Sequence, residues 1–276
     1  MARGISLHVG LNEVDPNHYR DGNGNPWRGE LRACENDARD MERLAREQGF
    51  EVRGPLLTAD AKADDVIDEV KAIAKELDSG DIFWLTYSGH GGQVSNSNPD
   101  DDPETDALDE TWCLFDRELL DDELFALFSE FKPGVRIVVF SDSCHSGTVT
   151  RARPRPSDAL DEFSVPKQLP IDVAEATEEA NADLYGSIQK AIPSKRLTSL
   201  GATVVLLSGC QDSEFSRDGQ KNGAFTGALL QAWQEPAARK SLPALREATA
   251  AGIPQQFNQN PNYSIYSFDI GPALTI

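Results

Sequence analysis

The chain has 276 residues, a length that fits one large domain or two small ones. Hydrophobic residues make up 39% of it, enough for a packed core, and no run approaches the ~18 apolar residues that a membrane-spanning helix needs. The net charge of -20 argues against a nucleic-acid partner, because phosphates would meet mostly like charge.

Apolar runs of strand length alternate with amphipathic helices along the chain. Strands are predicted at residues 5–10, 50–53, 81–87, 135–140, 202–208 and 263–268. Helices are predicted at residues 31–48, 62–77, 123–131 and 223–234. Continuous apolar strands separated by helices are typical of an α/β fold, with a mostly parallel central sheet and helices on both faces.

Residues 151–200 break this alternation. They open with Arg-Ala-Arg-Pro-Arg-Pro and then carry an excess of acidic residues. This composition predicts a mobile, poorly packed linker, with a helical piece around residues 173–192. We therefore expect a single domain, in which the linker joins a larger part (1–150) to a smaller part (201–276).

The amino terminus and the cysteines favour a reducing compartment. Residues 1–10 lack the apolar core of a secretory signal, so a cytoplasmic location is the default expectation. Neither a zinc site nor a disulfide framework is indicated, because no two of the four cysteines are clustered. These cysteines are Cys34, Cys113, Cys144 and Cys210.

Two glycine-rich turns each follow a predicted buried strand. His90 lies in the first turn and Cys144 in the second. The carboxyl ends of parallel strands meet at one edge of a sheet, so we expect the two side chains to face each other there. An imidazole activates a nearby thiol, and the backbone N–H groups of Gly91 and Cys144 could stabilise an oxyanion. The structural alternatives are an inert buried thiol and an ordinary core histidine.

Five segments in order carry a family resemblance. The His and Cys turns read Tyr-Ser-Gly-His-Gly-Gly and Asp-Ser-Cys-His-Ser-Gly. The other segments lie at residues 31–41, at residues 109–116, and at residues 208–213 together with 223–226. Together they resemble the metacaspases, caspase-like cysteine peptidases of family C14. His90 precedes Cys144 by 54 residues, close to the caspase spacing of about 50. The compact build suggests a prokaryotic member.

The resemblance implies a caspase-like three-layer sandwich and a cysteine endopeptidase. Cys144 would attack the peptide carbonyl, His90 would move the proton, and a thioester would be hydrolysed by water. Metacaspases cut after Arg or Lys, and the resemblance places the pocket for that side chain at Asp37, Ser88 and Asp142, with Cys34 lining it. Expected partners are proteins or peptides with a basic residue before the scissile bond.

Calcium is the one metal that the resemblance raises. The chemistry itself needs no cofactor, but some metacaspases require calcium. The corresponding positions here are Asp109, Asp121 and Asp122. At the fourth position the chain has Arg151, whose positive charge opposes a cation. The sequence therefore leaves calcium dependence open.

The linker offers basic residues at which such an enzyme could cut itself. We expect this segment to be exposed. It could be cut by the enzyme itself or by an upstream protease, and a regulatory partner could control the enzyme instead. The candidate cleavage residues are Arg151, Arg153, Lys190, Lys195 and Arg196, and Lys167 lies in the same stretch. A latent caspase-fold adaptor that acts by binding partners is the alternative. A nucleotide-binding α/β protein is disfavoured, because no phosphate-binding glycine loop follows the first strand.

Overall fold

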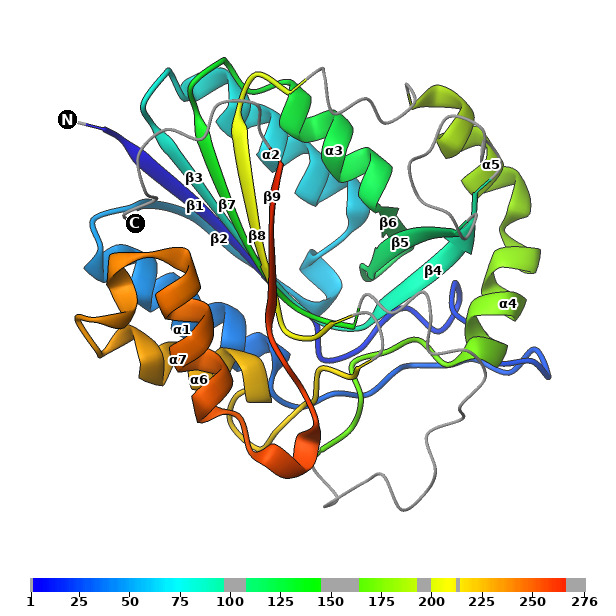
Figure 1. The fold of residues 1–276 in the computed structure, drawn as a ribbon. Coiled ribbons are helices and arrows are strands. Elements are labelled where there is room, and N and C mark those ends of the chain that lie inside the picture. Colours follow the sequence, from blue (N-terminus) through cyan, green and yellow to red (C-terminus); the bar gives the residue numbers. More distant parts are fainter. Residues whose placement is uncertain (1, 97–107, 145–163, 193–199, 212–213, 267–276) are drawn as a thin grey trace.

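A six-stranded sheet forms the centre of the molecule, as a computed structural model shows for residues 2–96, 108–144, 164–192, 200–211 and 214–266 (Figure 1). The strand order is β2-β1-β3-β7-β8-β9. Neighbouring strands are parallel except β9, which runs antiparallel to β8. The strands are β1 (Gly4–Gly10), β2 (Glu51–Leu57), β3 (Ile82–Ser88), β7 (Arg136–Asp142), β8 (Thr203–Ser208) and β9 (Asn262–Tyr266).

Helices cover both faces of this sheet (Figure 1). On one face lie α1 (Cys34–Glu47), α6 (Ala224–Trp233) and α7 (Leu242–Gly252), and on the other lie α2 (Ala63–Glu76) and α3 (Asp121–Ser129). Successive side chains of β3 point to opposite faces of the sheet and pack against the two helical layers. Phe83 stacks on Phe131 beside α3, whereas Trp84 stacks on Trp233 of α6. The predicted three-layer α/β sandwich is confirmed.

A second, antiparallel sheet of three strands projects from the carboxyl edge of the first. It consists of β4 (Gly91–Ser95), β5 (Leu108–Cys113) and β6 (Glu118–Leu120). Tyr87 at the end of β3 stacks on Trp112 of β5, with ring centroids 4.4 Å apart. The hydroxyl of Tyr87 also donates to the carbonyl of His90. These contacts fix the small sheet against the turn that carries His90.

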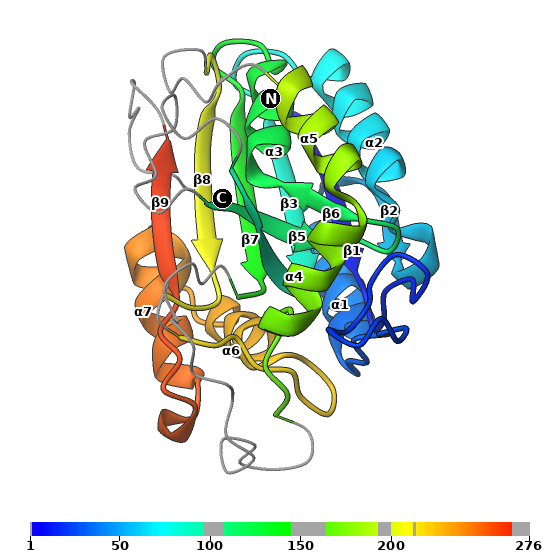
Figure 2. The same ribbon diagram turned by 90° about the vertical axis from the view of Figure 1, so that its right-hand side faces the viewer.

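Two helices, α4 (Ile171–Ala180) and α5 (Ala182–Ala191), lie against this small sheet (Figure 2). The prediction of an exposed, poorly packed segment is wrong for residues 164–192. Lys167 is fully buried, and α4 and α5 turn a buried stripe toward the protein at helical spacing. The stripe consists of Val173, Thr177, Tyr185 and Gln189.

The remaining sequence predictions differ from the structure mainly at element ends. The small sheet and α7 have no counterpart among the predicted elements, and residues 267–268 of the predicted last strand lie outside the described residues. No helix in the described part of the chain is long and apolar enough to cross a membrane.

Glu118 of β6 should make the stability of the fold depend on pH. Its carboxylate accepts a hydrogen bond from the Thr111 hydroxyl, but complete burial raises its pKa to about 7. The folded protein therefore keeps a proton that the unfolded chain releases near its ordinary pKa. As a result, the free energy of unfolding decreases as the pH rises from about 4.5 to 7. We predict that the free energy of unfolding of the wild type falls by roughly 2 to 3 kcal/mol between pH 5 and pH 8 because of Glu118, and that this decrease is absent in Glu118→Gln.

Urea unfolding of both proteins at the two pH values measures this difference. The free energy of unfolding should fall more steeply with pH in the wild type than in Glu118→Gln. Parallel pH profiles would show that Glu118 keeps an ordinary pKa in the folded protein.

Candidate active site

The register of two parallel strands brings the predicted histidine and cysteine to one edge of the sheet. Ser88 at the end of β3 lies opposite Asp142 at the end of β7. His90 and Cys144 each come two residues later in the chain, and both side chains are buried. The parallel pairing therefore accounts for their meeting at the carboxyl edge.

His90 is held as a neutral imidazole. Its Nε2 lies 2.9 Å from the carbonyl oxygen of Gly29, which accepts the Nε2 proton and leaves Nδ1 as the proton-accepting nitrogen. Burial lowers the pKa of His90 to about 4, although the backbones of Gly29 and Gln168 act in the opposite direction. Nδ1 has no hydrogen bond of normal geometry within the described residues, and the ring of Trp27 lies against the imidazole.

The thiol of Cys144 is held by the backbone of Ser216. The Ser216 N–H donates to Sγ at 3.1 Å, and Sγ lies 3.5 Å from the Ser216 carbonyl oxygen. Burial raises the pKa of Cys144 well above its ordinary value, so the sulfur is protonated in this arrangement. Among the described residues, His90 makes no hydrogen bond to this thiol, and deprotonation by His90 requires the thiol to turn away from Ser216.

The chain's own Lys167 occupies the position where an oxyanion would form. Its carbonyl oxygen accepts hydrogen bonds from the N–H groups of Gly91, at 3.0 Å, and Cys144, at 3.2 Å. A side chain at position 91 would collide with the backbone of Cys144, since an added Cβ would lie 1.9 Å from the Cys144 carbonyl oxygen. Glycine is therefore needed for the two donors to converge on one carbonyl oxygen.

Residues 164–169 cross the site and form isolated β-bridges at Pro166 and Gln168, with a bend at Lys167 between them. The N–H of Lys167 donates to Ser216, and the carbonyl of Val165 accepts from Asp218. On the other side of Lys167, the N–H of Leu169 donates to the carbonyl of Gly91 at 2.8 Å. The segment is thus paired with backbone on both sides of the Lys167–Gln168 bond, as a bound peptide strand would be.

The side chain of Lys167 ends in a pocket formed by the three residues predicted to bind a basic side chain. Its Nζ lies 2.9 Å from Ser88 Oγ, 3.1 Å from Asp142 Oδ2 and 3.2 Å from Asp37 Oδ2. Burial alone would lower the pKa of Lys167, but Asp142, Cys34 and Asp37 raise it well above its ordinary value. The pocket therefore holds an ammonium ion, and Cys34 is buried beside it, as expected.

Five residues from the carboxyl-terminal part complete this pocket and were missed by the sequence analysis. Amide and hydroxyl groups donate to Asp37 and Asp142, while the carboxylate of Asp218 accepts from the backbone before α1. These residues are Ser216, Asp218, Asn222, Gly223 and Thr226. They fall within or beside the segments that resemble the family, but no spacing in the sequence indicates that they reach the ends of β3 and β7.

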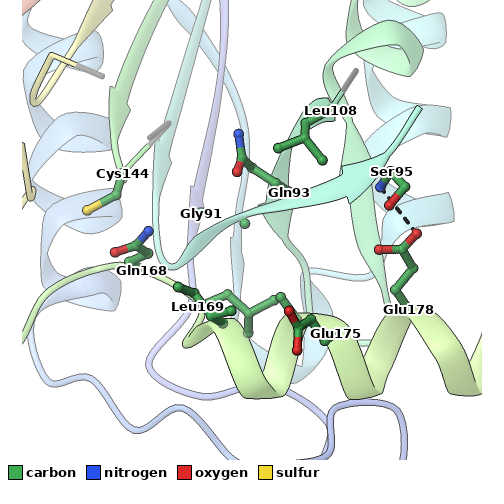
Figure 3. A pocket seen from close by; sticks show the side chains of 12 residues that line it. Gly91, Gln93, Ser95, Leu108, Cys144, Gln168, Leu169, Glu175 and Glu178 are labelled. Atoms are coloured by element: carbon green, nitrogen blue, oxygen red, sulfur yellow. Dashed lines mark hydrogen bonds between the residues drawn. The ribbon is translucent and has the colours of Figure 1, made fainter. Parts of the chain in front are cut away.

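A cavity of about 240 Å³ adjoins the site on the Gln168 side of the Lys167–Gln168 bond. It is bounded by Cys144 and Gln168 at one end and by β4 and α4 along its length (Figure 3). At its other end Glu178 accepts a hydrogen bond from the N–H of Ser95. The cavity lies where the residues after a scissile bond would pass.

The proposed calcium ligands do not form a metal site in the described part of the chain. Asp109 is fully buried, and its carboxylate accepts a hydrogen bond from the Gln189 amide at 2.9 Å. Asp121 and Asp122 lie at the start of α3. No group of three or more His, Cys, Asp or Glu side chains among the described residues could hold a metal ion. Arg151, at the fourth position, lies outside the described residues, so a calcium requirement stays a prediction.

Most of the predicted cleavage residues lie outside the described residues. This holds for Arg151, Arg153, Lys195 and Arg196. Lys190 is described, and it is exposed near the end of α5. The backbone of Lys190 is bonded within the helix and cannot pair with other strands as residues 165–169 do, so Lys190 is a poorer candidate in this structure.

A profile of the caspase domain matches residues 14–268. The chain belongs to the caspase domain family. It is 27% identical to metacaspase-1 of Mycosarcoma maydis over 86% of this chain and 66% of that protein. It is 28% identical to metacaspase-1 of Schizosaccharomyces pombe over 75% of this chain and 56% of that protein. This caspase-domain chain thus spans between about half and two thirds of these relatives.

Two solved structures share the fold of this chain. The crystal structure of the protein GSU0716 from Geobacter sulfurreducens has a TM-score of 0.81 and 44% identity, covering 97% of this chain and 94% of that one. Caspase-1 from Spodoptera frugiperda has a TM-score of 0.52 over 96% of this chain and 86% of that one. At 12% identity, this second likeness shows the caspase fold alone.

Gly223 should control whether Lys167 stays in its pocket. A Cβ at this position would lie 2.3 Å from Nζ of Lys167 and 2.4 Å from Oδ2 of Asp142. We predict that Gly223→Ala displaces the lysine, which costs charge-assisted hydrogen bonds and increases opening of the segment about 10- to 100-fold. Cys144 should then be alkylated faster, and trypsin should cut faster after Lys167, as followed by peptide mass spectrometry.

Gly227→Ala is the matched control. An added Cβ at Gly227 of α6 has its nearest neighbour at 3.5 Å, an ordinary contact distance. This variant should keep wild-type rates in both measurements. Unchanged alkylation and trypsin rates in Gly223→Ala would show that the pocket can hold lysine without glycine at position 223.

Proposed function

We propose that this protein is a cysteine endopeptidase that cuts protein or peptide substrates after Lys or Arg. The observation that supports it is the placement of Lys167, whose side chain ends between two carboxylates while its carbonyl accepts the N–H groups of Gly91 and Cys144. A single residue thus satisfies both the specificity pocket and the oxyanion donors. An exogenous peptide in the same register would present its own scissile bond to Cys144.

Cys144 and His90 would carry the chemistry. His90 takes the thiol proton through Nδ1, and the sulfur attacks the substrate carbonyl. The N–H groups of Gly91 and Cys144 stabilise the negative oxygen of the tetrahedral intermediate, because they already point at a carbonyl oxygen. His90 then gives its proton to the leaving amine, and water hydrolyses the thioester. No cofactor takes part in these steps.

Charge sets the preference at the pocket. Asp37 and Asp142 converge on one ammonium group, and Ser88 donates to Asp37 while accepting from Lys167. A buried pair of carboxylates attracts a cationic side chain and repels an acidic one. Lys and Arg are therefore the expected substrate residues, whereas an aspartate would add a third carboxylate.

A catalytically silent adaptor is the alternative function. It would need neither a nucleophile nor oxyanion donors. Here the N–H groups of Gly91 and of Cys144 itself already hold a peptide carbonyl. Acyl transfer needs such donors beside a nucleophile, so the arrangement favours the enzyme.

A panel of fluorogenic peptides that differ only at the residue before the reporter tests the proposal. The series Val-Pro-X, with X as Lys, Arg, Gln or Asp, copies residues 165–167 of the chain. We predict turnover of the Lys and Arg peptides only, faster in Lys167→Ala because the pocket is vacated, and none in Cys144→Ala. The assay is run with calcium and with a chelator, which measures any requirement for the ion.

Asp142→Asn separates specificity from reactivity. The substitution keeps the shape of the side chain and removes one charge, so kcat/KM for the Lys peptide should fall about 10- to 100-fold. Alkylation of Cys144 by a small uncharged reagent should persist. Equal turnover of all four peptides, or turnover by Cys144→Ala, would refute the proposal.

A further inference from the structure

The Lys167–Gln168 bond is positioned as the enzyme's own substrate. The carbonyl of Lys167 accepts hydrogen bonds from the N–H groups of Gly91 and Cys144, and Gln168 lines the same cavity as Cys144. The Lys167–Gln168 bond is therefore presented beside Cys144, at the edge of the sheet that also carries His90. Any reaction at the bond rests on the proposed peptidase function.

The residues after this bond are anchored without help from Lys167. Leu169 is buried in an apolar cluster, with 3% of its surface exposed, and its N–H donates to Gly91. The cluster consists of Val14, Tyr19, Cys113, Leu169 and Val173. Burying a leucine side chain is worth about 2 kcal/mol in transfer free energy, and that contact would remain after the bond is cut.

Helices α4 and α5 add further anchors to the rest of the protein (Figure 2). The N–H of Arg20 donates to Oγ1 of Thr177, and Nε2 of His18 lies 2.9 Å from the hydroxyl of Tyr185. At the end of α5, Gln189 donates to Asp109. We call residues 168–191 the docked segment. Cleavage at Lys167 would leave this segment, and the new amine of Gln168, in place.

We propose that Cys144 is acylated reversibly by the carbonyl group of Lys167. The amine of Gln168, kept in place by the docked segment, takes the acyl group back until that segment undocks. In the forward step a bond forms between Sγ of Cys144 and the carbonyl carbon of Lys167, and the bond to the nitrogen of Gln168 breaks. The thiol proton passes through His90 to that nitrogen. In the reverse step the amine of Gln168 attacks the thioester, which restores the peptide bond and the thiol.

Retention of the amine makes the reverse step fast. A nucleophile held beside an acyl group reacts as if present at a very high local concentration, whereas water must enter the same covered site. The intact chain is therefore regained in most cycles. Cleavage becomes permanent, and the primed side opens to other substrates, only when α4 and α5 undock.

Hydroxylamine tests the thioester directly, because it is small and traps an acyl group as a hydroxamate. Purified full-length protein is incubated with and without it, and intact masses are measured by mass spectrometry. We expect the chain to stay largely intact alone and to give residues 1–167 with a terminal hydroxamate when hydroxylamine is present. Cys144→Ala should stay intact in both cases.

A pair of substitutions in α5 tests the role of docking. Tyr185 is buried against the protein, whereas Leu184 is 39% exposed. Tyr185→Ala should raise the rate of hydrolytic cleavage after Lys167, without hydroxylamine, at least about tenfold. Leu184→Ala should behave like the wild type. Tyr185→Phe, which removes only the hydroxyl contacts, should shift the rate in the same direction if Tyr185→Ala does not fold.

Each result decides for or against the proposal. Rapid, complete hydrolysis of the wild type after Lys167 would overturn reversibility, and equal rates in Tyr185→Ala and Leu184→Ala would overturn the role of docking. Absence of hydroxamate from a protein that turns over the Lys peptide would overturn self-acylation while leaving the peptidase function intact. If Lys167→Ala fails to turn over that peptide, the proposed function itself fails.

Discussion

The buried contact between Lys167 and the carboxylates of Asp37 and Asp142 is the interaction on which the site depends. Two carboxylates facing one closed pocket would repel each other, and burial already raises the pKa of Asp37 to about 6. The ammonium group neutralises this pocket, and donors from Ser216, Asn222 and Thr226 satisfy the remaining oxygens. A buried ion pair of this kind is maintained only with such complete hydrogen bonding.

The same contact joins the two halves of the chain. Asp37 belongs to α1 and Asp142 to β7, while the donors that surround them come from the loop before α6 and from α6 itself. The pocket that would select a basic substrate residue is therefore also the place where the carboxyl-terminal part is tied to the sheet. Because the pocket is filled by the chain itself, the substrate recognition proposed above would use the same groups that hold Lys167. In the proposed enzyme, access of a substrate to Cys144 would then depend on how stably residues 164–169 are held.

The two sides of the Lys167–Gln168 bond differ in how they are held. Before the bond, residues 164–167 depend on backbone pairing with Ser216 and Asp218 and on the lysine pocket. After the bond, an apolar cluster and two helices anchor the chain to the small sheet. Anchors of the first kind can be exchanged for those of another peptide, whereas those of the second require a packed surface to open. In the proposed cycle, this asymmetry would allow the Lys167–Gln168 bond to be cut without undocking of α4 and α5.

The sequence by itself determined the alternation of strands and helices, the His90 and Cys144 turns, and the three residues of the pocket. The elements and the two turns depend on local periodicity and short motifs, which the order of residues contains directly, whereas the pocket residues were implied by the resemblance to metacaspases. It did not reveal the small antiparallel sheet, and it gave the wrong environment for Lys167, because a charged residue in a polar stretch is normally exposed. Only the tertiary structure decided that residues 164–191 pack across the site, since their burial depends on Gly91, Tyr19 and Ser216, which lie far away in the sequence. The same holds for Asn222, Gly223 and Thr226, whose place in the pocket depends on how α6 meets the end of β7.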